Sequence, residues 1–340
     1  MLPALAVADA LRERGVHVTF AGSPERAEAQ LVPAAGYELD TFRVSGLPRR
    51  PGVALVRALG RAVAAPFACR SILEQRRPDV VLGGGGYVAG PMVLAAWTKR
   101  IPAALTEADA HLGLANRLAA PFARRVLLAY DIPGRTGRKH AVVGRPVPAV
   151  SAPWPRERAR TALGLPADGP VLLVAGARAG ATALNDWAVE TFGASGPAVL
   201  HISGERDYPS LLGRVTRPDY VLLPVTEGLG AALGASDLAV SRAGGSVWEL
   251  AAAGMPAILV PYPYATADHQ TKNAQHFERA GGAIVVPETE LGRVGELVRS
   301  LLDDPPRLAA MAAAMRAASR PDAADGIAEE LIALAGRAQG

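Results

Sequence analysis

Hydrophobic and polar positions alternate with two different periods along this chain. Near its start, Leu5, Ala8 and Leu11 recur at helical spacing, behind a proline that suits a first helical turn. Residues 16–20 (VHVTF) then alternate between apolar and polar, as a strand does. The pattern therefore predicts a helix at the very start of the chain, with no strand before it.

Short apolar runs separated by helical patterns follow in two series. The first series comprises residues 16–20, 79–83, 101–109 and 124–130, with residues 141–143 (AVV) as a last short strand. The second series comprises residues 170–180, 198–204, 220–225, 237–245, 257–263 and 283–288. Continuous Val, Leu and Ile runs with helices between them are typical of parallel sheets covered on both faces. We therefore predict an α/β fold with two doubly wound, Rossmann-like domains and a cleft between them.

Several prolines at residues 146–155 mark the best candidate for a linker between the two domains. We accordingly expect an N-terminal domain over residues 1–147 and a C-terminal domain over residues 148–322. Residues 323–340 show the pattern of a last helix.

Composition narrows the class of protein. A length of 340 residues favours two domains, and the single cysteine, Cys69, can form no intrachain disulfide, which fits a reducing cytoplasm. The start does not have the pattern of a signal peptide, and no run of about 18 uncharged apolar residues predicts a membrane span. The net charge of +4 mildly favours anionic partners. Aromatic residues make up only 5% and are not interleaved with Lys and Arg, so the sequence indicates no nucleic-acid partner.

Residues 83–91 (GGGGYVAGP) place four glycines between a predicted strand and a predicted helix. A glycine backbone lets a ligand approach closely, and the N–H groups of a helix start point toward it. A tight turn would explain one glycine. Four glycines at the carboxyl end of a strand favour a ligand-binding loop, because open α/β sheets bind ligands at that end.

Residues 241–254 (SRAGGSVWELAAAG) repeat this arrangement in the second half. Gly244, Gly245 and Ser246 would form the first turn of a helix, whose N–H groups suit a diphosphate. The carboxylate of Glu249 suits the vicinal hydroxyls of a ribose, although helix glutamates are commonly just solvated. A later helix start carries polar side chains that suit sugar hydroxyls or helix capping. They are Asp268, His269, Gln270 and Asn273.

Four stretches together resemble the MurG family of peripheral membrane glycosyltransferases, which make lipid II. They are residues 79–91, 106–126, 203–208 and 241–283, and the resemblance runs from the first helix to about residue 310. It implies the GT-B fold and an inverting transfer of N-acetylglucosamine (GlcNAc) from UDP-GlcNAc to lipid I, with no metal or other cofactor. Lipid I is undecaprenyl-diphosphate-MurNAc-peptide, and its MurNAc C4 hydroxyl is the acceptor. The resemblance also implies a peripheral location on the cytoplasmic face of the cell membrane.

The resemblance further implies roles for individual residues. On the donor side, Glu249 would hold the ribose, residues 244–246 would face the phosphates of UDP, and the backbone of Thr226 would meet the uracil. Gln270 and Asp268 would bind the hydroxyls of GlcNAc. On the acceptor side, four residues would face the diphosphate of lipid I. They are Gly84, Gly85, Gly86 and Tyr87.

This chain departs from the family at three further positions that we expect to bind the donor. Asp109 stands where the family usually has Asn, which keeps an acceptor oxygen but adds a charge. Arg145, in the stretch GRPVP, would supply a guanidinium that the family carries a few residues later. Arg178 stands at the serine position of a glycine-rich loop.

An inverting transfer needs a base for the acceptor hydroxyl. The histidine that the family offers for this role is absent here. Glu107, Asp109 and His111 follow a predicted strand at its carboxyl end, where they would face the cleft. Each also has an ordinary explanation as a turn or capping residue, so all three stay candidates.

The start of the chain also departs from the family, at the place where that histidine would lie. Members of the family begin with a strand and a glycine loop that ends in that histidine, directly before the stretch corresponding to MLPALAV. The missing strand would lie in the middle of the first sheet, and each buried backbone group left unpaired would cost about 1–3 kcal/mol. We expect an additional segment of about 10–20 residues before Met1 to supply the strand and loop.

Two other functions stay open on the sequence: a UDP-sugar 2-epimerase, which shares this architecture and nucleotide site, and a non-catalytic nucleotide-sugar binder.

A lipid substrate favours a membrane-facing helix over residues 51–77, where apolar and basic residues are mixed. The apolar residues are Val53, Leu55, Val56, Leu59, Val63 and Phe67, and the basic ones are Arg57, Arg61 and Arg70. A core helix with solvated arginines would show the same pattern.

Overall fold

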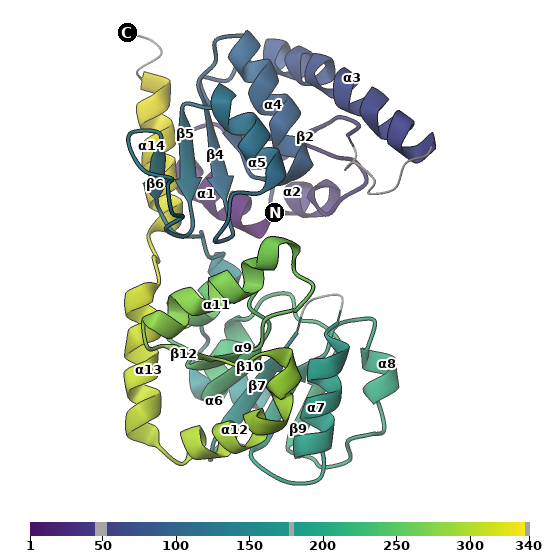
Figure 1. Cartoon of the computed structure of the whole chain (residues 1–340), viewed down its shortest axis with the longest axis vertical. Coiled ribbons are helices and arrows are strands. Elements are labelled where there is room, and N and C mark those ends of the chain that lie inside the picture. The colour runs from purple at the N-terminus through teal and green to yellow at the C-terminus, as the bar shows by residue number, and fades with distance from the viewer. Residues whose placement is uncertain (45–52, 177–179, 337–340) are drawn as a thin grey trace. The chain divides into compact units, whose positions relative to one another are not determined.

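A computed structural model describes residues 1–44, 53–176 and 180–336, without the side chains of residues 53–63. The chain divides into two compact units (Figure 1). The first comprises Met1–Pro146 together with Pro321–Gly340, and the second comprises Val147–Arg320. The division falls within the proline-rich stretch, and the end of the chain returns to the first unit. Each unit is described by itself.

The second unit contains a six-stranded sheet in which every pair of neighbours is parallel. Its strands are β7 (Val171–Ala175), β8 (Ala198–Ile202), β9 (Tyr220–Leu223), β10 (Leu238–Ser241), β11 (Ala257–Leu259) and β12 (Ala283–Val285). They stand in the order β12-β11-β10-β7-β8-β9. Counted from β7, this is the order 3-2-1-4-5-6 of a doubly wound nucleotide-binding fold, which confirms the predicted fold class.

Helices precede, connect and follow these strands. They are α6 (Arg156–Leu163), α7 (Thr182–Phe192), α8 (Tyr208–Leu211), α9 (Gly230–Ala235), α10 (Val247–Ala253), α11 (His269–Arg279), α12 (Val294–Leu302) and α13 (Pro305–Ala318). Apolar side chains of α7 and α12 pack with those of the strands in one core, in which Leu184, Val174, Val240, Ile258 and Val298 are fully buried. The continuous apolar runs in the sequence are therefore explained by strands that contact protein rather than water.

The first unit contains two parallel sheets. Strands β1 (Thr19–Gly22) and β2 (Glu38–Thr41) form a pair, and four strands follow in the order β3-β4-β5-β6. The latter are β3 (Val81–Gly83), β4 (Ala103–Glu107), β5 (Arg125–Leu128) and β6 (His140–Val142). The helices are α1 (Leu2–Glu13), α2 (Glu28–Ala34), α3 (Val53–Arg76), α4 (Gly86–Thr98), α5 (Leu114–Ala119) and α14 (Ala323–Gly336).

The four-stranded sheet is covered on both faces. Leu105 and Val126 pack with the inner sides of α3 and α4, whereas the alternate residues Ala104 and Leu127 pack with α1 and α14. Successive side chains of a strand point to opposite faces, so two separate cores are required. Figure 1 shows α14 alongside β5 and β6. The last helix of the chain thus completes the core of the first unit.

The first unit's sheet is interrupted between its two parts. No ladder joins the β1–β2 pair to the four-stranded sheet among the described residues. The apolar packing nevertheless continues across the interruption, because Val18, just before β1, packs in the same cluster as Val80 and Leu82. β1 itself is only half-buried at Thr19, Phe20 and Ala21, unlike the four inner strands of the second unit, β7, β8, β10 and β11.

A buried polar network crosses the second unit's core. His201, in the middle of β8, has no exposed surface. Its Nδ1 lies 2.9 Å from the Tyr220 hydroxyl and its Nε2 lies 3.0 Å from Oδ1 of Asn185. Because an amide oxygen only accepts, Nε2 carries the proton and Nδ1 accepts from the tyrosine. Asn185 in turn donates to the carbonyl of Ser203 and to Asp207.

This network predicts an acid-sensitive fold. Burial lowers the pKa of His201 to about 4, whereas the unfolded chain would take up the proton near its ordinary pKa of about 6.5. The contribution of neutral His201 to the free energy of unfolding is therefore fully present above about pH 6.5. It is lost as the pH falls toward 4, because the unfolded state then binds more protons than the folded state. We expect about 2 kcal/mol of the free energy of unfolding to be lost through His201 between pH 7 and pH 5.

Urea unfolding at pH 7 and pH 5 measures this loss against the variant His201→Gln, whose amide can replace both hydrogen bonds. The variant should show a smaller loss by about 2 kcal/mol. His276, whose pKa is also lowered by burial, is present in both proteins and cancels. The same pH dependence in both proteins would contradict the role assigned to His201.

Candidate functional site

In the second unit, a glycine turn joins β10 to α10. The carbonyls of Gly244, Gly245 and Ser246 each accept a hydrogen bond from the N–H group three residues later, at 3.3, 3.3 and 3.0 Å. A Cβ added to Gly244 would meet nothing within 4 Å, so the backbone there is open to a ligand. Glu249 follows in the first turn of α10 and is half-buried.

The start of α11 is tied to this turn by one buried hydrogen bond, and exposed hydrogen bonds hold its polar side chains. Asn273 is fully buried, and its side-chain amide donates to the carbonyl of Ala243 at 3.2 Å. Oε1 of Gln270 accepts the N–H of Tyr262 at 2.9 Å, which fixes the orientation of the Gln270 amide. Asp268 accepts the hydroxyl of Thr271 at 2.6 Å. The structure thus brings together the two predicted parts of the donor site that follow β10 and β11.

A buried arginine that the sequence did not single out supports the same loops. Arg242 is 6% exposed, forms an ion pair with Glu288, and donates to the carbonyls of Val260 and Pro261 at 3.3 Å each. Its guanidinium also lies 5.5 Å from the centre of the Tyr262 ring. A charged residue at the end of an apolar strand is the signal that could have found it, since buried charges need partners.

The other residues predicted to bind the donor lie elsewhere in the chain. Thr226 lies in the loop between β9 and α9, where its hydroxyl donates to the carbonyl of Gly228 at 2.6 Å. Asp109 and Arg145 belong to the first unit, after β4 and β6 respectively. Arg178 lies outside the described residues.

In the first unit, the four-glycine stretch divides into two roles. A Cβ at Gly83 would lie 2.7 Å from Cδ2 of Leu105, so this glycine serves close packing of the strand. Gly85 and Gly86 have φ angles of +89° and +69°, which L side chains rarely adopt. A Cβ at Gly86 would meet nothing within 4 Å, and the first turn of α4 carries no acidic residue. Of the glycines at the start of α4, Gly86 therefore has the open backbone, directly before Tyr87, whereas a Cβ at Gly84 or Gly85 would make ordinary contacts at 3.9 and 3.6 Å.

Glu107 organises the loop that follows β4. It is 8% exposed. Its carboxylate accepts the N–H groups of Ala108 at 3.0 Å, Asp109 at 3.3 Å and Gly113 at 2.9 Å, and the side-chain amide of Asn116 at 2.9 Å. These four donors occupy the lone pairs that a general base would need, so the structure indicates a loop-positioning role for Glu107. Asp109 and His111 lie in the loop that it holds.

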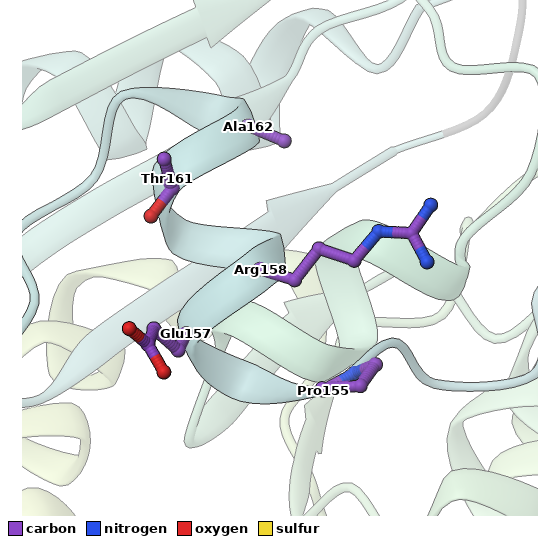
Figure 2. A pocket seen from close by; sticks show the side chains of 5 residues that line it. All are labelled: Pro155, Glu157, Arg158, Thr161 and Ala162. Atoms are coloured by element: carbon purple, nitrogen blue, oxygen red, sulfur yellow. The ribbon is translucent and has the colours of Figure 1, made fainter.

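One surface cavity lies away from the predicted site residues. A cavity of about 510 Å³ lies on α6 and is lined by Pro155, Glu157, Arg158, Thr161 and Ala162 (Figure 2). It contains none of the predicted site residues, and its charged side chains are exposed. Among residues 1–44, 53–176 and 180–336, no group of three or more His, Cys, Asp or Glu side chains could hold a metal ion.

Comparisons with known proteins extend these observations. Residues 1–128 match the glycosyltransferase family 28 N-terminal domain and residues 171–327 match its C-terminal domain. A protein of Acidithiobacillus ferrooxidans is 42% identical over 350 residues, which cover 99% of this chain and 95% of that protein. Its name is UDP-N-acetylglucosamine–N-acetylmuramyl-(pentapeptide) pyrophosphoryl-undecaprenol N-acetylglucosamine transferase. A protein of the same name from Halorhodospira halophila is 40% identical over 343 residues, covering 96% and 92%.

Solved structures show the same relationship. The crystal structure of MurG from Acinetobacter baumannii is similar with a TM-score of 0.76 and 27% identity, covering 97% of this chain and 95% of that one. UDP-GlcNAc 2-epimerase from Neisseria meningitidis has a TM-score of 0.67 at 15% identity, covering 98% and 96%. The second similarity concerns the fold alone.

Proposed function

The chain belongs to the MurG family within glycosyltransferase family 28, and from this premise we propose that it transfers GlcNAc from UDP-GlcNAc to lipid I, giving lipid II. The observation that carries the proposal is 42% identity to a transferase of this name over 99% of the chain. The enzyme is thus a UDP-GlcNAc-dependent N-acetylglucosaminyltransferase of peptidoglycan synthesis. The epimerase alternative is supported by fold alone, at 15% identity, and is not favoured.

We propose that the turn and helix after β10 bind the donor. Backbone N–H groups of residues 244–246 stabilise the charge that develops on departing UDP, and Glu249 accepts hydrogen bonds from the ribose. Gln270 then presents its side-chain N–H₂ group to the sugar, because its oxygen is held by the N–H of Tyr262. Asp268 completes the proposed donor contacts of the second unit, and Thr226 meets the uracil with its backbone. Asp109 and Arg145, in the first unit, stay predicted donor-binding residues.

The acceptor side is proposed at the start of α4. Gly84, Gly85 and Gly86 would face a diphosphate, with the open backbone at Gly86, and Tyr87 lies beside them. For the base that deprotonates the MurNAc C4 hydroxyl, we propose Asp109 or His111, because Glu107 already accepts four hydrogen bonds from its own loop.

Labelled UDP-GlcNAc incubated with a lipid I analogue tests the transfer. A labelled disaccharide lipid is expected. Release of an epimerised free sugar would indicate an epimerase, and binding without a product would indicate a non-catalytic binder.

In the same assay, replacing the base should lower kcat at least about 100-fold, so Asp109→Asn and His111→Gln are compared. Equal kcat in both variants and the unmodified enzyme would remove both candidates.

Glu249→Ala should weaken UDP binding by about 1.5–3 kcal/mol, or roughly 10- to 150-fold, the range for hydrogen bonds to a charged group. Titration calorimetry with UDP measures the change. Glu296→Ala is the matched control, because Glu296 is an exposed glutamate in the first turn of α12 in the same unit. If the two variants bind UDP equally well, Glu249 does not hold the ribose.

We also propose that the first unit attaches peripherally to the cytoplasmic face of the membrane. Large apolar side chains are exposed on three helices of which α4 packs against both others. These are Phe67 (74% exposed), Trp97 (56%), Leu114 (67%) and Leu118 (67%). Exposed apolar groups near basic residues such as Arg70 and Arg117 suit an anionic lipid surface. Of the residues expected to form this face on α3, only Phe67 and Arg70 have described side chains. None of the described helices is long and apolar enough to span a bilayer.

Vesicle flotation tests this attachment. The double variant Phe67→Ser, Trp97→Ser should be recovered with anionic vesicles several-fold less than the unmodified protein, because both apolar anchors are lost. Leu212→Ser is the control, since Leu212 is 55% exposed but belongs to the second unit. Equal recovery of the unmodified protein with anionic and neutral vesicles would contradict the proposed electrostatic contribution.

A further inference from the structure

An exposed arginine lies against the proposed acceptor loop from a different part of the sequence. Arg26 belongs to the loop between β1 and α2, and its guanidinium carbon lies 5.4 Å from the centre of the Tyr87 ring. Within the described part of the chain, Arg26 forms no ion pair, unlike Arg76 and Arg125 of the same unit. A cation is therefore held beside the residue that follows Gly84, Gly85 and Gly86.

The loop that carries Arg26 is built to hold one conformation. The carboxylate of Glu28 accepts the N–H of the buried Ser23 at 3.1 Å, and the Ser23 hydroxyl accepts the N–H of Glu25 at 3.4 Å. A Cβ at Gly22 would lie 2.7 Å from Cγ of Glu28, so the close approach requires glycine. Glu28 thereby fixes the loop rather than neutralising Arg26.

The aromatic ring limits where the guanidinium can go. A guanidinium over the face of a tyrosine is attracted electrostatically to the ring. Tyr87 is itself fixed by α4, whose start has two glycines with positive φ. Arg26 and the open backbone at Gly86 are therefore kept together although they lie about 60 residues apart in the chain.

We propose that Arg26 binds the diphosphate of the polyprenyl acceptor, with Tyr87 as the residue that positions it. The inference rests on the proposed function, because it names a further residue of the acceptor site. A guanidinium donates to two phosphate oxygens at once, in a geometry that neither a neutral hydroxyl nor a lysine reproduces. Arg26 accordingly selects a diphosphate over an uncharged lipid of equal length.

Binding of farnesyl diphosphate, with farnesol as the uncharged comparison, tests the proposal on the full chain independently of transfer. The unmodified protein should bind the diphosphate more tightly than farnesol. Arg26→Ala should weaken diphosphate binding about 10- to 100-fold and leave farnesol binding unchanged. Arg26→Lys should be intermediate. Tyr87→Leu, which removes the aromatic face, should weaken diphosphate binding more than Tyr87→Phe, which keeps it.

Arg124→Ala is the matched control, because Arg124 is an exposed arginine of the same unit. It directly precedes β5 and so lies at the amino end of that strand, away from the strand ends that carry the acceptor loop. This variant should bind like the unmodified protein. In the transfer assay, Arg26→Ala should raise the KM for the lipid I analogue and not that for UDP-GlcNAc. Equal diphosphate binding by Arg26→Ala and the unmodified protein would overturn the inference, as would no preference of the unmodified protein for the diphosphate. Failure of transfer with Arg26-dependent diphosphate binding would instead overturn the proposed function.

Discussion

Parallel strand pairing is the constraint on which both candidate sites depend. When all strands of a sheet run the same way, their carboxyl ends meet at one edge, and the loops that leave that edge are brought together. In the second unit this edge collects the turn at residues 244–246 and the loop that follows β11. In the first unit, the edge of the four-stranded sheet collects the four-glycine stretch after β3 and the loop of Glu107 after β4. The loop of Arg26 follows β1 of the separate pair and meets the four-glycine stretch through Tyr87.

Loops at such an edge need internal support, and buried polar side chains provide it here. Glu107 gathers four N–H donors of its own loop, Asn273 ties α11 to Ala243, and Arg242 holds the carbonyls of Val260 and Pro261. Each of these groups would be costly to bury without its partners. They position the backbone that we propose to contact the two substrates, and they are distinct from the residues that would contact them.

Much of this arrangement could be predicted from the sequence, because local patterns determine it. The apolar runs became parallel strands, and the glycines after residues 83 and 243 became turns at strand ends. Interactions between distant segments could not be predicted in this way. Nothing in the sequence pairs Arg26 with Tyr87 or places the last helix on the first unit. The sequence also does not show that His201, in an otherwise apolar strand, contacts Tyr220 and Asn185. Glu107 was predicted as a possible base from its place at a strand end, and the four hydrogen bonds that its carboxylate accepts within its own loop could not be predicted from the sequence.

The account depends most directly on where the nucleotide binds. A crystal structure of the chain with UDP would locate it. We expect the ribose hydroxyls about 2.7–3.2 Å from the carboxylate of Glu249, with the diphosphate at the N–H groups of residues 244–246. UDP bound elsewhere on the second unit, for example in the cavity on α6, or bound with its ribose out of reach of Glu249, would contradict the account.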